Sequence, residues 1–66
     1  MEAYQEKIIL EKNELKEKTD KLGSFILDNP VYQALEEEEK LLLNEQHFHM
    51  CNYLDILEKR IKKFKN

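Results

Sequence analysis

The stretch from residue 41 to residue 64 constrains the fold most, because it carries most of the large apolar side chains at helical spacing. At about 100° per residue, an apolar band forms on one face. Its members are Leu43, His47, Met50, Leu54, Leu57, Ile61 and Phe64. Leu43, Met50, Leu57 and Phe64 recur every seven residues, as in helices packed side by side. The stretch therefore predicts one long helix, about residues 37–64, lying against another helix.

The apolar surface of this helix is wider than one neighbouring helix can cover. Gln46, Tyr53 and Arg60 lie along one flank, and Leu42, His49 and Ile56 lie just beyond them. A single core is marginal in a chain of 66 residues without disulfides, metal or oligomerisation. The sequence therefore predicts a homo-oligomer in which hairpins associate into a helical bundle.

The first half predicts a helix over about residues 2–28, with a narrower apolar face. Its members are Met1, Tyr4, Ile8, Leu15, Leu22 and Ile26, with Glu11 and Lys18 in the same face. Gly23 costs about 1 kcal/mol relative to alanine, but we expect the helix to run through it. Asn29 followed by Pro30 is a typical N-cap and first-turn proline, which ends this helix and starts a short one over about residues 30–35.

Two long helices joined by a short link must lie antiparallel. The fold class is therefore all-α, a coiled-coil-like antiparallel helical hairpin, with residues 1–66 as one domain. This pairing sets Lys18 beside Tyr53 and Glu11 beside Arg60, which predicts polar layers between the helices. These residues have two possible roles. They fix the register, or Lys18, Tyr53 and Arg60 hold the phosphates and stack on the base of a ligand.

Charge and composition limit the partners. The formal net charge is −3, and one cysteine excludes an intramolecular disulfide, which predicts a reducing, cytoplasmic setting. Lys59, Arg60, Lys62, Lys63 and Lys65 near one helix end and residues 36–39 near the other complement the helix dipole. The negative charge disfavours nucleic-acid binding, and no segment predicts a signal peptide or membrane span.

No residue set predicts catalysis or a bound cofactor. His47, His49 and Cys51 are close in sequence, but only His47 and Cys51 share a helix face, and two ligands do not close a zinc site. The chain has no Gly-rich phosphate loop and no nucleophile elbow. We therefore expect no metal, no cofactor, no catalytic residue and no enzymatic activity.

A spaced pattern runs through nearly the whole chain. It reads Tyr4-x-x-Lys7, Glu11-x-x-Glu14-Leu15-x-x-Lys18-x-x-Lys21-Leu22-x-x-Phe25, then Leu41-Leu42-x3-Gln46-x3-Met50-x2-Tyr53-x3-Leu57-x2-Arg60-Ile61. The pattern resembles a family of small uncharacterised helical-hairpin proteins of phages and prophages. That family is similar to the hairpin domain of phage anti-CBASS and anti-Thoeris proteins, oligomeric sponges that bind cyclic nucleotide or cyclic ADP-ribose signals and silence bacterial immunity.

The resemblance implies a phage protein of the bacterial host cytosol that sequesters such a signal without turnover and so evades defence. In the sponges an early tyrosine stacks on the ligand and a later lysine holds phosphate, which implies Tyr4 and Lys18 here. With Tyr53 and Arg60 they make the expected ligand-binding set, and the expected partners are a second copy of the chain and a small nucleotide signal. The alternative is a structural or regulatory module that docks a host or phage protein through its spare apolar face.

Overall fold

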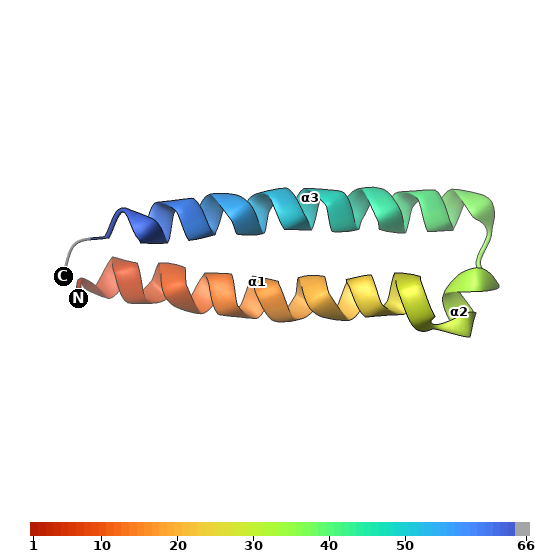
Figure 1. Ribbon diagram of the computed structural model, residues 1–66, viewed down its shortest axis with the longest axis horizontal. Helices are drawn as coiled ribbons and strands as arrows, with labels where there is room; N and C mark the ends of the chain where they lie inside the picture. Colours follow the sequence, from red (N-terminus) through yellow and green to blue (C-terminus); the bar gives the residue numbers. More distant parts are fainter. Residues whose placement is uncertain (65–66) are drawn as a thin grey trace.

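The computed structural model describes residues 1–64 and shows two long helices side by side, joined by a short one (Figure 1). Helix α1 spans Ala3–Asp28, α2 spans Pro30–Gln33 and α3 spans Glu37–Lys62, and no strand occurs among the described residues. The hairpin measures 48 × 15 × 14 Å, and α1 begins at the end where α3 finishes (Figure 1). The all-α antiparallel hairpin is therefore confirmed. None of the three helices is long and apolar enough to cross a membrane.

Two breaks in the backbone make the turn. Asn29 leaves the helical region (φ −92°, ψ 123°), and its Oδ1 accepts a hydrogen bond of 2.8 Å from the Val31 N–H, with Pro30 opening α2. Glu36 is extended (φ −60°, ψ 150°) and separates α2 from α3. The short helix therefore ends at Gln33, before residue 35, where the sequence placed its end.

Tyr32 on α2 closes this end of the hairpin. Its ring meets Phe25 of α1 edge to face, with 5.9 Å between centroids, and the Asn44 Nδ2 of α3 donates a 2.7 Å hydrogen bond to its hydroxyl. Tyr32 is buried because its one polar group has this partner. One side chain thus ties the short helix to both long ones.

The predicted apolar band of α3 is its buried stripe. All seven members, from Leu43 to Phe64, are buried or half-buried, and Leu57, near the C-terminal end of the helix, is 0% exposed. Tyr53, Ile56 and Leu42 on the flank are exposed instead. The spacing by three and four residues was sufficient to identify this face.

The predicted face of α1 is right at Ile8, Leu15, Leu22 and Ile26, which are half-buried, but wrong at Lys18. Thr19 is 4% exposed, while Lys18, which the sequence placed in the face, is exposed. Threonine can be buried here because its hydroxyl donates a 2.7 Å hydrogen bond to the Leu15 carbonyl, whereas a buried ammonium would need a charged partner. The buried stripe of α1 consists of Gln5, Ile8, Lys12, Leu15, Thr19, Leu22 and Ile26.

The helices approach closely at Gly23, and α1 runs through it as expected. A Cβ added to Gly23 would lie 3.0 Å from the His47 Nε2, so Gly23 and His47 lie directly across from each other. The predicted polar layers are not formed as bonded pairs. Within residues 1–64 no hydrogen bond or ion pair joins Glu11 to Arg60 or Lys18 to Tyr53, and every ion pair lies inside one helix.

Candidate functional site

The four predicted ligand-binding residues lie at the surface. Tyr53 is 44% exposed, and Tyr4, Lys18 and Arg60 are also exposed. In the described part of the chain neither Lys18 nor Arg60 has an ion-pair partner. Their charges and the tyrosine rings are therefore available to a bound molecule.

The register of α1 against α3 sets the level of each of these residues, by which we mean its position along the long axis of the hairpin. Because Gly23 lies across from His47 and each residue rises 1.5 Å, Lys18 and Tyr53 share about one level. Tyr4 lies about 21 Å further along α1, where its ring meets Phe64 edge on, with 5.9 Å between centroids. The hairpin therefore brings Lys18 and Tyr53 together in level but leaves Tyr4 at the open end.

A groove of about 460 Å³ runs along one flank of the helix pair, and its lining includes Gly23, His47, Cys51, Asp55 and Glu58. The Cys51 Sγ lies 3.9 Å from each ring nitrogen of His47, so these two share a face as predicted. No group of three or more histidine, cysteine or acidic side chains is placed to hold a metal among residues 1–64. The carboxylates of the groove repel an anionic ligand.

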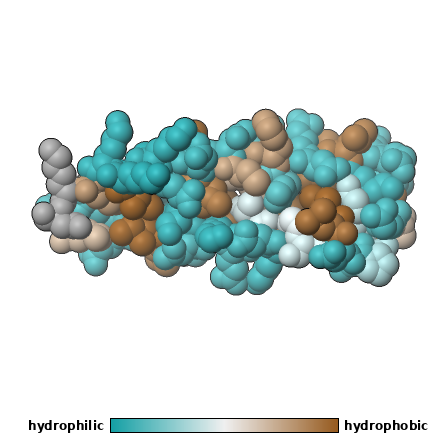
Figure 2. Space-filling view, viewed as in Figure 1, coloured by the Kyte–Doolittle hydropathy of each residue, from teal (hydrophilic) through white to brown (hydrophobic). Residues whose placement is uncertain are grey.

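The sequence did not reveal this groove, because it depends on which α3 residue Gly23 faces. Gly23 and His47, which lie against each other, both belong to its lining. A space-filling view shows hydrophobic patches separated by hydrophilic side chains along the face turned to the viewer (Figure 2). That face therefore offers no continuous apolar band to a partner helix.

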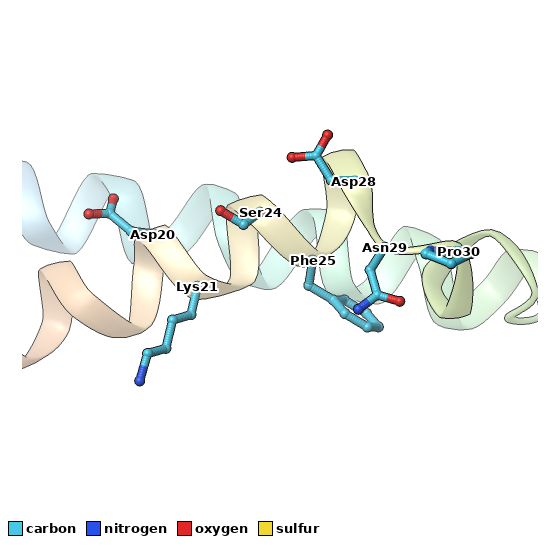
Figure 3. Close-up of a pocket in the computed structure, with 7 residues that line it drawn as sticks. All are labelled: Asp20, Lys21, Ser24, Phe25, Asp28, Asn29 and Pro30. Atoms are coloured by element: carbon cyan, nitrogen blue, oxygen red, sulfur yellow. The ribbon is translucent and has the colours of Figure 1, made fainter.

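A second hollow of about 580 Å³ lies outside α1, beside the turn into α2. Asp20, Ser24 and Asp28 project from one edge of α1, while Lys21 and Phe25 project from the other (Figure 3). The hollow is thus bordered by side chains that diverge from one another. It does not gather donors around a single point and has no geometry for a specific ligand.

The sequence of this chain matches one known protein family. The curated proteins and the solved structures contain no significant match to this chain. One protein-family model does match, described as Sequestin, and it covers residues 2–63. That range includes α1, α2 and α3 entirely, with both buried stripes except Phe64. The helical hairpin as a whole is thus the unit that defines the family, and this chain belongs to the Sequestin family.

Proposed function

We propose that this chain is a phage-encoded sponge that binds a cyclic nucleotide or a cyclic ADP-ribose-type signal and holds it without turnover. The observation that carries the proposal is the Sequestin match over residues 2–63, a family name that suggests sequestration. Because the match spans the hairpin, the function belongs to the hairpin itself. In the host cytosol, removal of the signal would silence the defence that depends on it.

The exposed side chains supply the chemistry that such a ligand needs. Lys18 and Arg60, which have no ion-pair partner among residues 1–64, offer cations to phosphate oxygens. Charge-assisted hydrogen bonds of this kind are about twice as strong as neutral ones. Tyr4 and Tyr53 offer exposed rings, and stacking of a base on an aromatic ring is worth about 1–3 kcal/mol. Lys18 with Tyr53, which share a level, are the best placed to hold one nucleotide unit.

A second function is favoured by the apolar surface of α3. Leu42 and Ile56 are 55% and 54% exposed on one side, and Leu41 and Phe48 are exposed elsewhere on the helix. Helices with such faces commonly dock on a protein partner. A structural or regulatory module that binds a host or phage protein is therefore the alternative.

The test is a thermal-shift screen of the full chain against cyclic dinucleotides, cyclic trinucleotides and ADP-ribose isomers. Binding to the folded state alone stabilises it by about 2.7 kcal/mol at a hundredfold excess over Kd, which is several degrees of Tm in a small domain. The ligand recovered after denaturation should be chemically intact. A modified ligand would indicate an enzyme instead.

Matched variants separate a site from a general charge effect. Lys18→Ala and Tyr53→Ala should abolish the shift, whereas Lys62→Ala and Phe48→Ala should keep it. Lys62 is likewise an exposed cation without an ion pair among residues 1–64, and Phe48 is likewise an exposed ring. If no compound shifts the Tm, or the control variants lose the shift equally, the docking-module function replaces this one.

A further inference from the structure

Helix α3 carries a second stripe with the same spacing as its buried one. We call it the outer stripe, and it consists of Leu42, Gln46, His49, Tyr53, Ile56 and Arg60. These residues follow one another by four and three positions, which is the repeat that packs one helix along another. All are exposed. The outer stripe is turned about 100° from the buried stripe, which is where a second neighbouring helix of a bundle would lie.

The surface area shows how much of the chain remains to be covered. A compact monomer of this 8.0 kDa mass would expose roughly 4,450 Å², whereas the hairpin exposes 5309 Å². The excess of roughly 850 Å² is close to the 800 Å² or so that each partner contributes to a stable protein interface. The elongated hairpin therefore has enough surplus surface for one interface of standard size.

Charge along α3 decides the direction of that partner. The first turn carries Glu37, Glu38 and Glu39, and the last turn carries Lys59, Arg60 and Lys62. Two α3 helices laid parallel would place like charges together at both ends. Laid antiparallel, they place the acidic end of each helix beside the basic end of the other, which is favourable.

We infer that a second copy of this chain docks on the outer stripe, with the two α3 helices antiparallel about a twofold axis. The axis passes between His49 and Tyr53, so that His49 of each chain faces the partner's Tyr53. In the same register Gln46 faces the partner's Ile56, and Leu42 faces the partner's Arg60. Two hairpins joined in this way form a four-helix bundle with α3 helices adjacent at its centre.

In this dimer, some of the candidate ligand residues lie near the twofold axis and one lies far from it. What this means for the ligand rests on the proposed function. Tyr53 of both chains lies within about 3 Å of the axis along the helix, and Lys18 shares its level. Arg60 lies about 13 Å along the helix from the axis, beside the partner's acidic end. A ligand at the edge of the interface, level with the axis, would therefore reach Lys18 and Tyr53, whereas Arg60 would lie too far along the helix to contact the same nucleotide unit.

The first test measures mass without any ligand. Light scattering of the full chain at micromolar concentration should give twice 8.0 kDa. Ile56→Lys places an ammonium inside the interface and should weaken the dimer more than about tenfold, as loss of a central contact commonly does. Leu41→Lys is the control, since Leu41 is 68% exposed on the side of α3 away from both stripes and should leave the dimer intact.

Circular dichroism of each variant checks that the hairpin is still helical. A monomeric wild type, a dimer that survives Ile56→Lys, or a dimer that is lost with Leu41→Lys overturns the inference. The result is independent of the ligand screen. A monomer that binds a nucleotide would overturn only the dimer, and a dimer that binds none would overturn only the sponge.

The second test measures direction. In a Cys51→Ser background, chains with Gln46→Cys are mixed with chains with Ile56→Cys under mild oxidation. A disulfide needs Cα atoms within about 7 Å. The antiparallel register brings 46 and 56 of different chains together but keeps the two 46 positions about 15 Å apart along the axis. The mixture should therefore cross-link, and self-linked Gln46→Cys chains would overturn the antiparallel arrangement.

Discussion

The two long helices of this hairpin have equal length but different surfaces. Helix α1 and helix α3 each contain 26 residues and lie against each other from end to end. The buried stripe of α1 includes Gln5, Lys12 and Thr19, whereas His47 is the one polar member of the buried stripe of α3. Helix α3 also carries the outer stripe. The difference teaches that α1 buries a mixed polar and apolar stripe against α3, whereas α3 buries a mostly apolar stripe and carries a second stripe that is exposed.

Most of the buried apolar surface that stabilises the hairpin therefore comes from α3. Two polar side chains of the α1 stripe have hydrogen-bond partners close in sequence. Thr19 donates to the Leu15 carbonyl and Gln5 accepts from the Glu2 N–H, so they permit contact without adding much apolar burial. Among residues 1–64, Leu57 is the one side chain that is buried completely. Mutations at equivalent depth in the two stripes should therefore differ in size.

The largest effect is expected from Leu57→Ala. Removal of a fully buried leucine side chain costs about 2–5 kcal/mol, from lost transfer energy and the cavity left behind. Thr19→Ala, in the α1 stripe, should cost less than about 1 kcal/mol, because its hydrogen bond is local and one methyl is lost. Urea unfolding monitored by circular dichroism measures both.

Leu41→Ala serves as the control for residue type, since Leu41 is exposed and its truncation should change stability by no more than about 0.5 kcal/mol. Equal losses from Leu57→Ala and Thr19→Ala would mean that the two stripes contribute equally. The proposed difference between the helices would then be wrong.

The sequence predicted what depends on spacing along the chain. The buried stripe of α3 is wide and apolar, so its period identifies it without knowledge of the partner. Asn29 and Pro30 end α1 and start α2 through local chemistry. Asn29 leaves the helical region, and its side chain caps α2 by accepting a 2.8 Å hydrogen bond from the Val31 N–H. The hairpin follows from these two features.

The sequence could not choose between Lys18 and Thr19 for the buried position of α1. Adjacent residues differ by about 100° around a helix, and a narrow stripe does not resolve that difference. The choice depends on the facing helix and on the ability of Thr19 to satisfy its hydroxyl internally. The contact between Gly23 and His47 is likewise a property of both helices together.

For the candidate site, the sequence identified residues with suitable chemistry but not their positions along the hairpin. Tyr4, Lys18, Tyr53 and Arg60 are exposed, so the packing of the hairpin places few constraints on them. Their levels follow from the register, which groups Lys18 with Tyr53 and leaves Tyr4 at the open end. A sequence pattern alone does not measure that separation.

A smaller change in stability is expected at Gly23, where α1 lies closest to the His47 ring of α3. Alanine is about 1 kcal/mol better than glycine inside a helix, but a Cβ at Gly23 would lie 3.0 Å from the His47 Nε2 and the ring must shift. Gly23→Ala alone should therefore gain much less than about 1 kcal/mol or lose stability. Gly23→Ala combined with His47→Ala should recover the full gain relative to His47→Ala.

This double-mutant cycle isolates the contact, because the two residues touch and their effects should not add. Urea unfolding of the four proteins gives the coupling. Additive effects would show that the His47 ring moves aside freely. The close approach would then not fix the register of α1 against α3.

The smallest effect is expected from the loss of one exposed ion pair, and it should be equal in α1 and α3. A difference between the helices would therefore be informative. Glu17 pairs with Lys21 in α1 at 3.0 Å, and Asp55 pairs with Lys59 in α3 at 2.9 Å, all on exposed side chains. Exposed pairs four residues apart contribute about 0.3–0.5 kcal/mol and are screened by salt. Glu17→Gln and Asp55→Asn should each lose about that amount in low salt and almost nothing in about 1 M salt. A clearly larger loss in α1 would show that surface charge compensates for its poorer buried stripe, so that the two helices differ in how they are stabilised and not only in how much.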